Sequence, residues 1–85
     1  MAFNTKITLT WASAADQINP DVDAARTVLL TQMESEGKTD GVLERVSDVV
    51  SIRHFIDVAA ANEYGSGIVS ICNANAVTPP TYVID

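Results

Sequence analysis

The stretch from Val42 to Ile56 constrains the fold most, because it is dense in Val and Ile and too long for one ordinary strand. Strands in globular proteins run about 5–6 residues. The polar pair Ser47-Asp48 divides the stretch, so the sequence predicts two strands, the second ending at Phe55-Ile56. One bent strand with a bulge is the alternative. Alternate residues of a strand point to the same face. The even-numbered positions carry Val42, Val46, Val50, Ile52 and Ile56, and the odd-numbered positions carry Leu43, Val49 and Phe55.

Helix start signals lie on both sides of this stretch. Asn19-Pro20 predicts the first helix, because an Asn side chain caps free N–H groups and a Pro at the first helical position loses no hydrogen bond. This helix is expected to end at Gly37 in a left-handed cap. Asp57 predicts the cap of a second, Ala-rich helix, which ends at residues 73–75.

Apolar residues at helical spacing predict which side of each helix is buried. In the first helix the expected buried stripe is Val22, Ala25, Val28 or Leu29, and Met33, while Arg26, Gln32 and Glu36 face water. In the second helix the expected stripe is Ala61, Tyr64, Ile68, Ile71 and Cys72.

Two further strands complete the pattern of elements. Ile7, Leu9 and Trp11 alternate with threonines, which is typical of a half-buried strand, and residues 12–17 are expected to form a loop. A short last strand at a sheet edge is expected at residues 82–84, after the extended turn at Pro79-Pro80.

The resulting order is strand, helix, strand, strand, helix, strand. It predicts an α+β fold in one domain over residues 1–85: the ferredoxin-like split β-α-β arrangement, a four-stranded antiparallel sheet with both helices on one face. The other sheet face is then open. Parity assigns to this open face Thr8, Thr10, Arg45, Ser51 and Arg53, mixed with some apolar residues.

The charge balance argues against polyanionic partners. The chain has 5 basic and 11 acidic residues, a net charge of −6, and no cluster of basic residues. Nucleic acids and anionic membranes are bound through clustered Lys and Arg. No apolar run approaches the roughly 20 residues of a spanning helix, and no secretory signal is visible. We therefore expect no nucleic-acid or membrane partner and a cytoplasmic location.

No group of residues predicts a catalytic, metal or cofactor site. Cys72 is the single cysteine, so an intramolecular disulfide and a multi-Cys metal site are excluded. His54 is the single histidine and has no sequence link to a second ligand or a nucleophile. Gly65-Ser66-Gly67 falls inside the second helix, where it cannot serve as a phosphate loop. The acidic pairs Asp21/Asp23 and Glu34/Glu36 are interpreted as a helix N-terminus and a solvated face.

The most distinctive residues lie between Thr39 and Tyr64. They are the turn Thr39-Asp40-Gly41, then Arg53-x-Phe55, the Asp57 cap, and Ala61 followed by Tyr64. This pattern resembles short proteins encoded among the structural genes of tailed bacteriophages. The resemblance implies a phage context, with the host cytoplasm or the virion as the location, and implies no enzymatic mechanism.

Three functional hypotheses follow. The first is a non-enzymatic structural or interaction protein of phage type, acting as a homo-oligomer or within a larger assembly, without cofactor or small-molecule substrate. Its candidate protein contacts are Phe3, Trp11, Arg53 and Tyr82, although core packing is also expected for Trp11. The second is a small dimeric α+β-barrel enzyme of oxygenase or isomerase type, with His54 and Tyr64 in one pocket. The third is an acidic inhibitor of a host protein.

Overall fold

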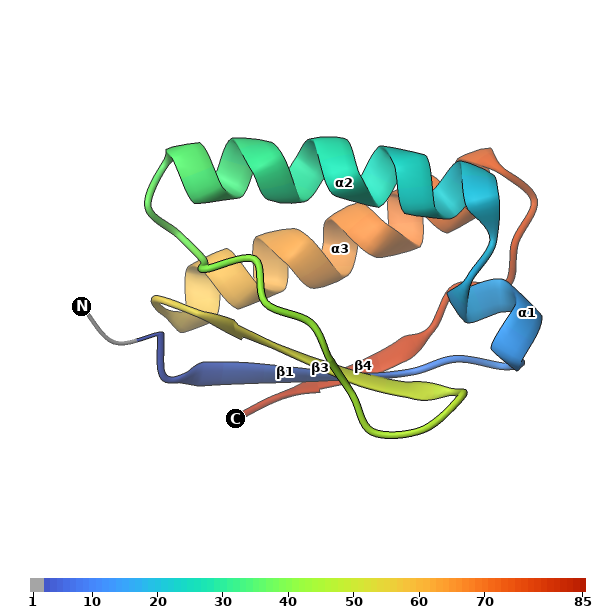
Figure 1. The fold of residues 1–85 in the computed structure, drawn as a ribbon, viewed down its shortest axis with the longest axis horizontal. Helices are drawn as coiled ribbons and strands as arrows, with labels where there is room; N and C mark the ends of the chain where they lie inside the picture. Colours follow the sequence, from blue (N-terminus) through green and yellow to red (C-terminus); the bar gives the residue numbers. More distant parts are fainter. Residues whose placement is uncertain (1–2) are drawn as a thin grey trace.

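The computed structural model describes residues 3–85, which form a four-stranded sheet with helices on one side (Figure 1). The elements in chain order are β1 (Thr5–Thr10), α1 (Ala14–Gln17), α2 (Pro20–Ser35), β2 (Glu44–Arg45), β3 (Val50–Phe55), α3 (Val58–Ala74) and β4 (Thr81–Ile84).

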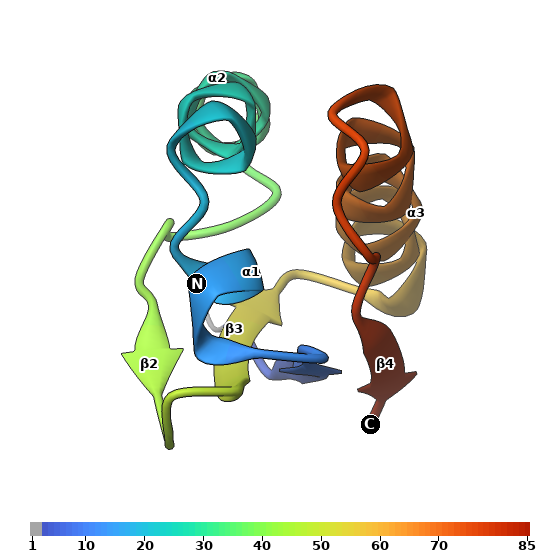
Figure 2. The same cartoon turned by 90° about the vertical axis from the view of Figure 1, so that its right-hand side faces the viewer.

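The sheet has the strand order β2-β3-β1-β4, and every neighbouring pair is antiparallel. This α+β topology is compatible with the predicted ferredoxin-like arrangement. Figure 2 shows α2 and α3 side by side above the sheet, while no element lies below it in the described chain. The lower face of the sheet is therefore open.

The stretch from Val42 to Ile56 forms two strands, so the two-strand prediction is confirmed and the bent strand is wrong. The N–H groups of Val46 and Ser47 both donate to the Val50 carbonyl, at 3.0 and 3.1 Å. The Ser47 hydroxyl oxygen accepts from the N–H groups of Val49 and Val50. A polar side chain thus satisfies the backbone of the tight turn that separates β2 from β3.

Helix α3 packs directly on the sheet and supplies much of the core. The Asp57 carboxylate caps it by accepting from the Ala60 N–H at 2.8 Å. Its buried residues include Ala61, Tyr64, Ile68 and Cys72, as the helical spacing predicts. They contact a core that also contains Ile7, Leu9, Trp11, Val22, Met33 and Phe55.

Helix α2 packs on α3, and no Cα atom of α2 lies within 8 Å of a strand Cα atom. Its predicted start and end are confirmed: the Asn19 side chain caps it, and Gly37 follows it with φ +74°. Its predicted buried side is partly wrong. Arg26, expected to face water, is only 6% exposed. Of the alternatives Val28 and Leu29, Leu29 packs against the core and Val28 is 70% exposed.

Arg26 is buried together with hydrogen-bond partners for its guanidinium. Its guanidinium donates to the Asp23 carboxylate and to the Gln17 carbonyl. The short helix α1 stands where a loop was expected. It buries Gln17, whose side-chain amide donates to the Ser47 and Asp48 carbonyls and so ties α1 to the β2–β3 turn.

Candidate protein-contact surface

The orientation of β3 decides which residues the open face presents. Along β3, Ser51, Arg53 and Phe55 are buried toward the helices. Phe55 packs on Tyr64 of α3 with ring centroids 5.1 Å apart. Successive side chains of a strand point to opposite faces, so Ile52 and its parity partners lie on the open face.

The assignment of residues to the open face that was made from the sequence is therefore wrong at three positions. Ser51 and Arg53 are 4% and 6% exposed on the helix side, not on the open face. Arg45 is paired with Ser51 and shares its parity, although its position at the sheet edge leaves it exposed. Thr8 and Thr10 do lie on the open face, as expected.

Arg53 is buried because a loop and a ring accommodate its guanidinium. Its Nη1 donates to the Gly41 carbonyl at 2.8 Å, and its Cζ lies 5.7 Å from the centre of the Tyr64 ring. Its Nε has no hydrogen-bond partner among the described residues. Burial raises the pKa of the Tyr64 hydroxyl, and the positive charge of Arg53 opposes this effect.

The turn at residues 39–41 is fixed to the same cluster. The Thr39 hydroxyl donates to the His54 carbonyl at 2.8 Å, and its oxygen accepts from the Gly41 N–H at 3.1 Å. Gly41 has φ +73°. A Cβ there would meet the exposed Glu34 carboxylate, which can move aside, so the positive φ is the reason for glycine at this position. Only glycine fits this position without strain.

The residues that carry the phage resemblance thus meet in one place. Thr39, Gly41, Arg53, Phe55 and Tyr64 form a contiguous cluster between the β2 side of the sheet and α3. Asp57 caps the helix that brings Tyr64 into it. These residues hold the loop before β2 against β3, so the pattern has a structural role in this fold.

The open face carries three cross-strand rows of side chains. The strand register aligns Ile52, Thr8 and Val83 in the middle row, with Glu44 at its β2 end. Val50, Thr10 and Thr81 form a second row, and His54 and Lys6 a third. The centre of this face is apolar and threonine-rich, and Lys6 and Glu44 lie toward its margins. A surface of this composition suits packing against another protein.

The four contact candidates from the sequence are distributed differently. Trp11 is 3% exposed and Arg53 is 6% exposed, so neither offers a surface to a partner. Phe3 is half-buried before β1. Tyr82 is half-buried on the helix side of β4, with its ring against Gly65 and its hydroxyl donating to the Asn62 side chain at 3.4 Å.

Sequence reasoning missed the residues that form the centre of the open face. The sequence-based parity placed Ile52 and Val50 opposite to Ser51 and Arg53, away from the expected open face, and assigned Val83 to neither face. Phe55 could have indicated the correct face. It is the largest side chain of β3, it points to the same face as Arg53, and it packs against Tyr64, the aromatic residue of α3.

The geometry separates the two residues that the enzyme hypothesis places in one pocket. His54 follows Arg53 and precedes Phe55, so it points to the open face, whereas Tyr64 is 2% exposed on the helix side. Residues 3–85 contain no detected pocket and no group of three or more potential metal ligands. None of the helices in this range could cross a membrane.

Comparisons with known proteins give no relative for this chain. No protein family, curated protein or solved structure matches it.

Proposed function

We propose that this chain is a non-enzymatic structural or interaction protein that works through the open face of its sheet, as a homo-oligomer or within a larger assembly. The observation that carries the proposal is the row Ile52–Thr8–Val83, which lies across β3, β1 and β4 with no helix over it. Burying this apolar surface against another protein removes it from water, which favours formation of the complex.

The phage-type context belongs to the same proposal. The resemblance over residues 39–64 supports it, and the role of those residues in one packed cluster is compatible with a small structural protein. The host cytoplasm or the virion is the proposed location, and a protein is the proposed partner.

Site-specific photo-crosslinking in cells that naturally produce the chain tests this function. A photoreactive amino acid is placed at Thr8 on the open face, and at the exposed Thr31 of α2 as a matched control. We expect a discrete higher-mass adduct from position 8 and none from position 31, with the adduct identified by mass spectrometry. Ile52→Lys should abolish the adduct. No adduct from position 8, or equal adducts from both positions, would contradict the proposal.

A further inference from the structure

The outer edge of β4 has free backbone groups. Lys6 and Asp85 exchange two backbone hydrogen bonds, at 3.1 and 2.8 Å, so Asp85, Val83 and Thr81 direct their backbone groups toward β1. Because these directions alternate along a strand, the N–H and C=O groups of Tyr82 and Ile84 point away from the sheet. No strand in residues 3–85 lies beyond β4 in the sheet order.

The two edges of this sheet are protected differently. Proteins usually block an edge strand with charges, with shortness, with proline, or with a bulge. β2 has this protection: it is two residues long, and both residues, Glu44 and Arg45, are charged and exposed. β4 spans four residues, Thr81–Ile84, between Pro80 and Asp85, has no charge or proline within these residues, and pairs in regular register with β1. β4 is thus the edge on which another strand can pair.

The surface beside β4 is almost free of charge. From Val58 to Asp85 only Glu63 and Asp85 are charged, although the chain carries a net charge of −6. The hydrogen bond from Tyr82 to Asn62 places one side of α3 next to β4. At helical spacing from Asn62, this side also carries Ser66, Val69 and Asn73. Figure 2 shows β4 below α3, while α2 lies on the other side of the molecule. Two copies of an acidic chain can approach here with little like-charge repulsion.

The hydrogen-bonding pattern of β4 is also self-complementary. We propose that two copies pair antiparallel through β4, around a two-fold axis that passes beside Val83. In this register Tyr82 of each copy exchanges two backbone hydrogen bonds with Ile84 of the second copy. All the outward N–H and C=O groups of Tyr82 and Ile84 are then paired. A register centred on Tyr82 places Ile84 opposite Pro80, which has no N–H, and so leaves the Ile84 carbonyl unpaired.

The pairing joins the two sheets into one eight-stranded sheet. The two-fold axis is perpendicular to the sheet, so both open faces lie on the same side and form one continuous surface. This inference rests on the proposed function only in making the chain a homo-oligomer. The β4 edge forms the pair, and the open face stays free for another protein. Val83 borders both surfaces, so Ile52→Lys, which changes the open face alone, shows which of the two proposals has failed.

Charge substitutions at Val83 test the pairing. Val83 is 63% exposed, and its side chain faces Val83 of the second copy in the proposed register. We expect the natural chain to have about twice its 9.1 kDa mass in sedimentation equilibrium. Val83→Lys and Val83→Glu should each fall to one chain, because like charges then oppose each other. An equimolar mixture of the two variants should regain the mass of two chains.

Two control variants and the circular dichroism spectrum make the result decisive. Val28→Lys adds the same charge at an exposed position of α2, and Ile52→Lys adds it on the open face away from the edge. Both should keep the mass of two chains, and all variants should keep the natural spectrum. A natural chain of single mass, unchanged masses for the Val83 variants, a mixture that stays at one chain, or loss of association in Ile52→Lys would each overturn the proposal. The crosslink from Thr8 is measured separately and reports on the proposed function alone.

Discussion

At the scale of single residues, Tyr64 makes the largest individual contribution that can be tested. It is 2% exposed, packs on Phe55, and lies under the Arg53 guanidinium. Tyr64→Ala should lower the free energy of unfolding by about 3 kcal/mol or more, as for other buried aromatics. This is a large share of a total near 5 kcal/mol for a small domain. Denaturant melts measure the change.

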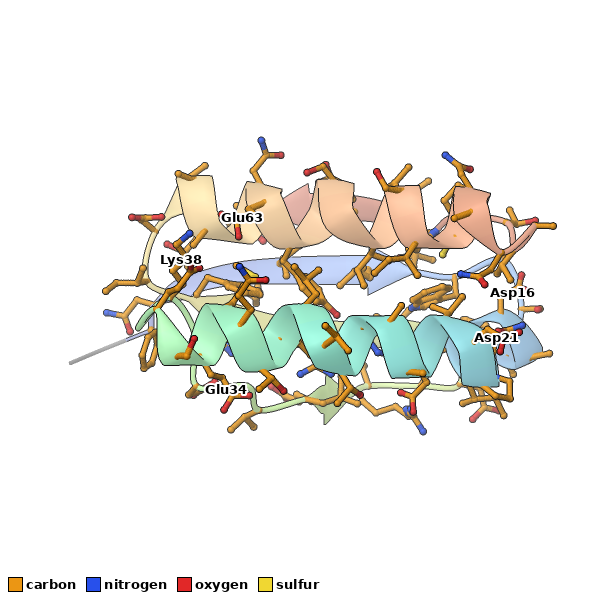
Figure 3. The ribbon with its side chains drawn as sticks, turned by 90° about the horizontal axis from the view of Figure 1, so that it is seen from above. Asp16, Asp21, Glu34, Lys38 and Glu63 are labelled. Carbon is orange, nitrogen blue, oxygen red and sulfur yellow. The ribbon has the colours of Figure 1, made fainter. Side chains whose placement is uncertain are left out.

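The neighbouring Glu63 is the matched control for Tyr64. Its carboxylate lies 2.9 Å from Lys38 Nζ at the end of the two helices, and both side chains are well exposed (Figure 3). Exposed ion pairs contribute little, so Glu63→Ala should stay within about 0.5 kcal/mol of the natural chain. A larger loss from Glu63→Ala than from Tyr64→Ala would mean that α3 faces the other way.

The buried hydroxyl of Tyr64 also predicts alkaline sensitivity. Burial raises its pKa above the ordinary value, so the folded state keeps a proton that the unfolded state releases. Its contribution is fully present below the unfolded pKa, about 10, and is lost as pH rises through the folded pKa. Unfolding curves measured from neutral to strongly alkaline pH should therefore shift to lower denaturant. Tyr64→Phe should reduce that shift, and an unchanged pH dependence in Tyr64→Phe would refute this cause.

Arg53 shows why single-residue reasoning from the sequence fails here. An arginine between Ile52 and His54 in a strand is expected to face water, because burying an unpaired charge is costly. In the structure, the Gly41 carbonyl and the Tyr64 ring accommodate it. Both partners are distant in sequence, so no local pattern around Arg53 indicates them. Arg26 is buried for a similar reason, beside Asp23 and the Gln17 carbonyl.

At the scale of elements, the approach of α3 to β4 depends on Gly65. A Cβ at this position would lie 2.7 Å from Tyr82 Cζ, closer than real Cβ contacts allow. Gly65→Ala should therefore destabilise the natural chain, despite the gain of about 1 kcal/mol in helix propensity. In a Tyr82→Ala background the same change should become stabilising. Thermal or denaturant melts of the four chains measure this coupling, and the same effect of Gly65→Ala in both backgrounds would contradict it.

Element order and helix ends were predictable because they depend on local chemistry. Asn19-Pro20, Asp57 and Gly37 mark ends through their own hydrogen bonds and dihedral angles. The buried sides of α2 and β3 depend on distances between layers. α2 packs on α3 and not directly on the strands, and the long side chains of Arg26 and Leu30 are buried beside the expected Val22 and Met33. The short helix α1 was missed because its anchor, Gln17, bonds to a distant turn.

At the scale of the whole molecule, the distribution of charge predicts no binding to duplex DNA at physiological salt. Of the five basic residues, Arg26 and Arg53 are buried and Lys38 contacts both Glu36 and Glu63. Few basic side chains therefore remain free to contact DNA phosphates and release the counterions condensed on the duplex. Fluorescence anisotropy with a labelled random duplex should show no change, and salt-dependent micromolar binding would contradict this expectation.

The candidate site could be predicted only in outline. The topology predicts that one sheet face is open, and this follows from the sequence because both helices return to the same side. The identity of its residues does not follow, since Ile52 and Ser51 are both compatible with a strand interior. The contact between Phe55 and Tyr64 selects between the two faces, and it joins elements that the sequence alone does not orient.

The central claim is that the face with Thr8 and Ile52 is open while the face with Ser51 and Arg53 is covered. Thiol reactivity of Thr8→Cys and Ser51→Cys tests it most directly, with the buried Cys72 as an internal reference. Thr8→Cys, at a half-buried position on the open face, should react without local opening of the sheet. Ser51→Cys should react at least about tenfold more slowly, because it needs local opening. A protected thiol at position 8 with a reactive one at position 51 would contradict this assignment of the two faces.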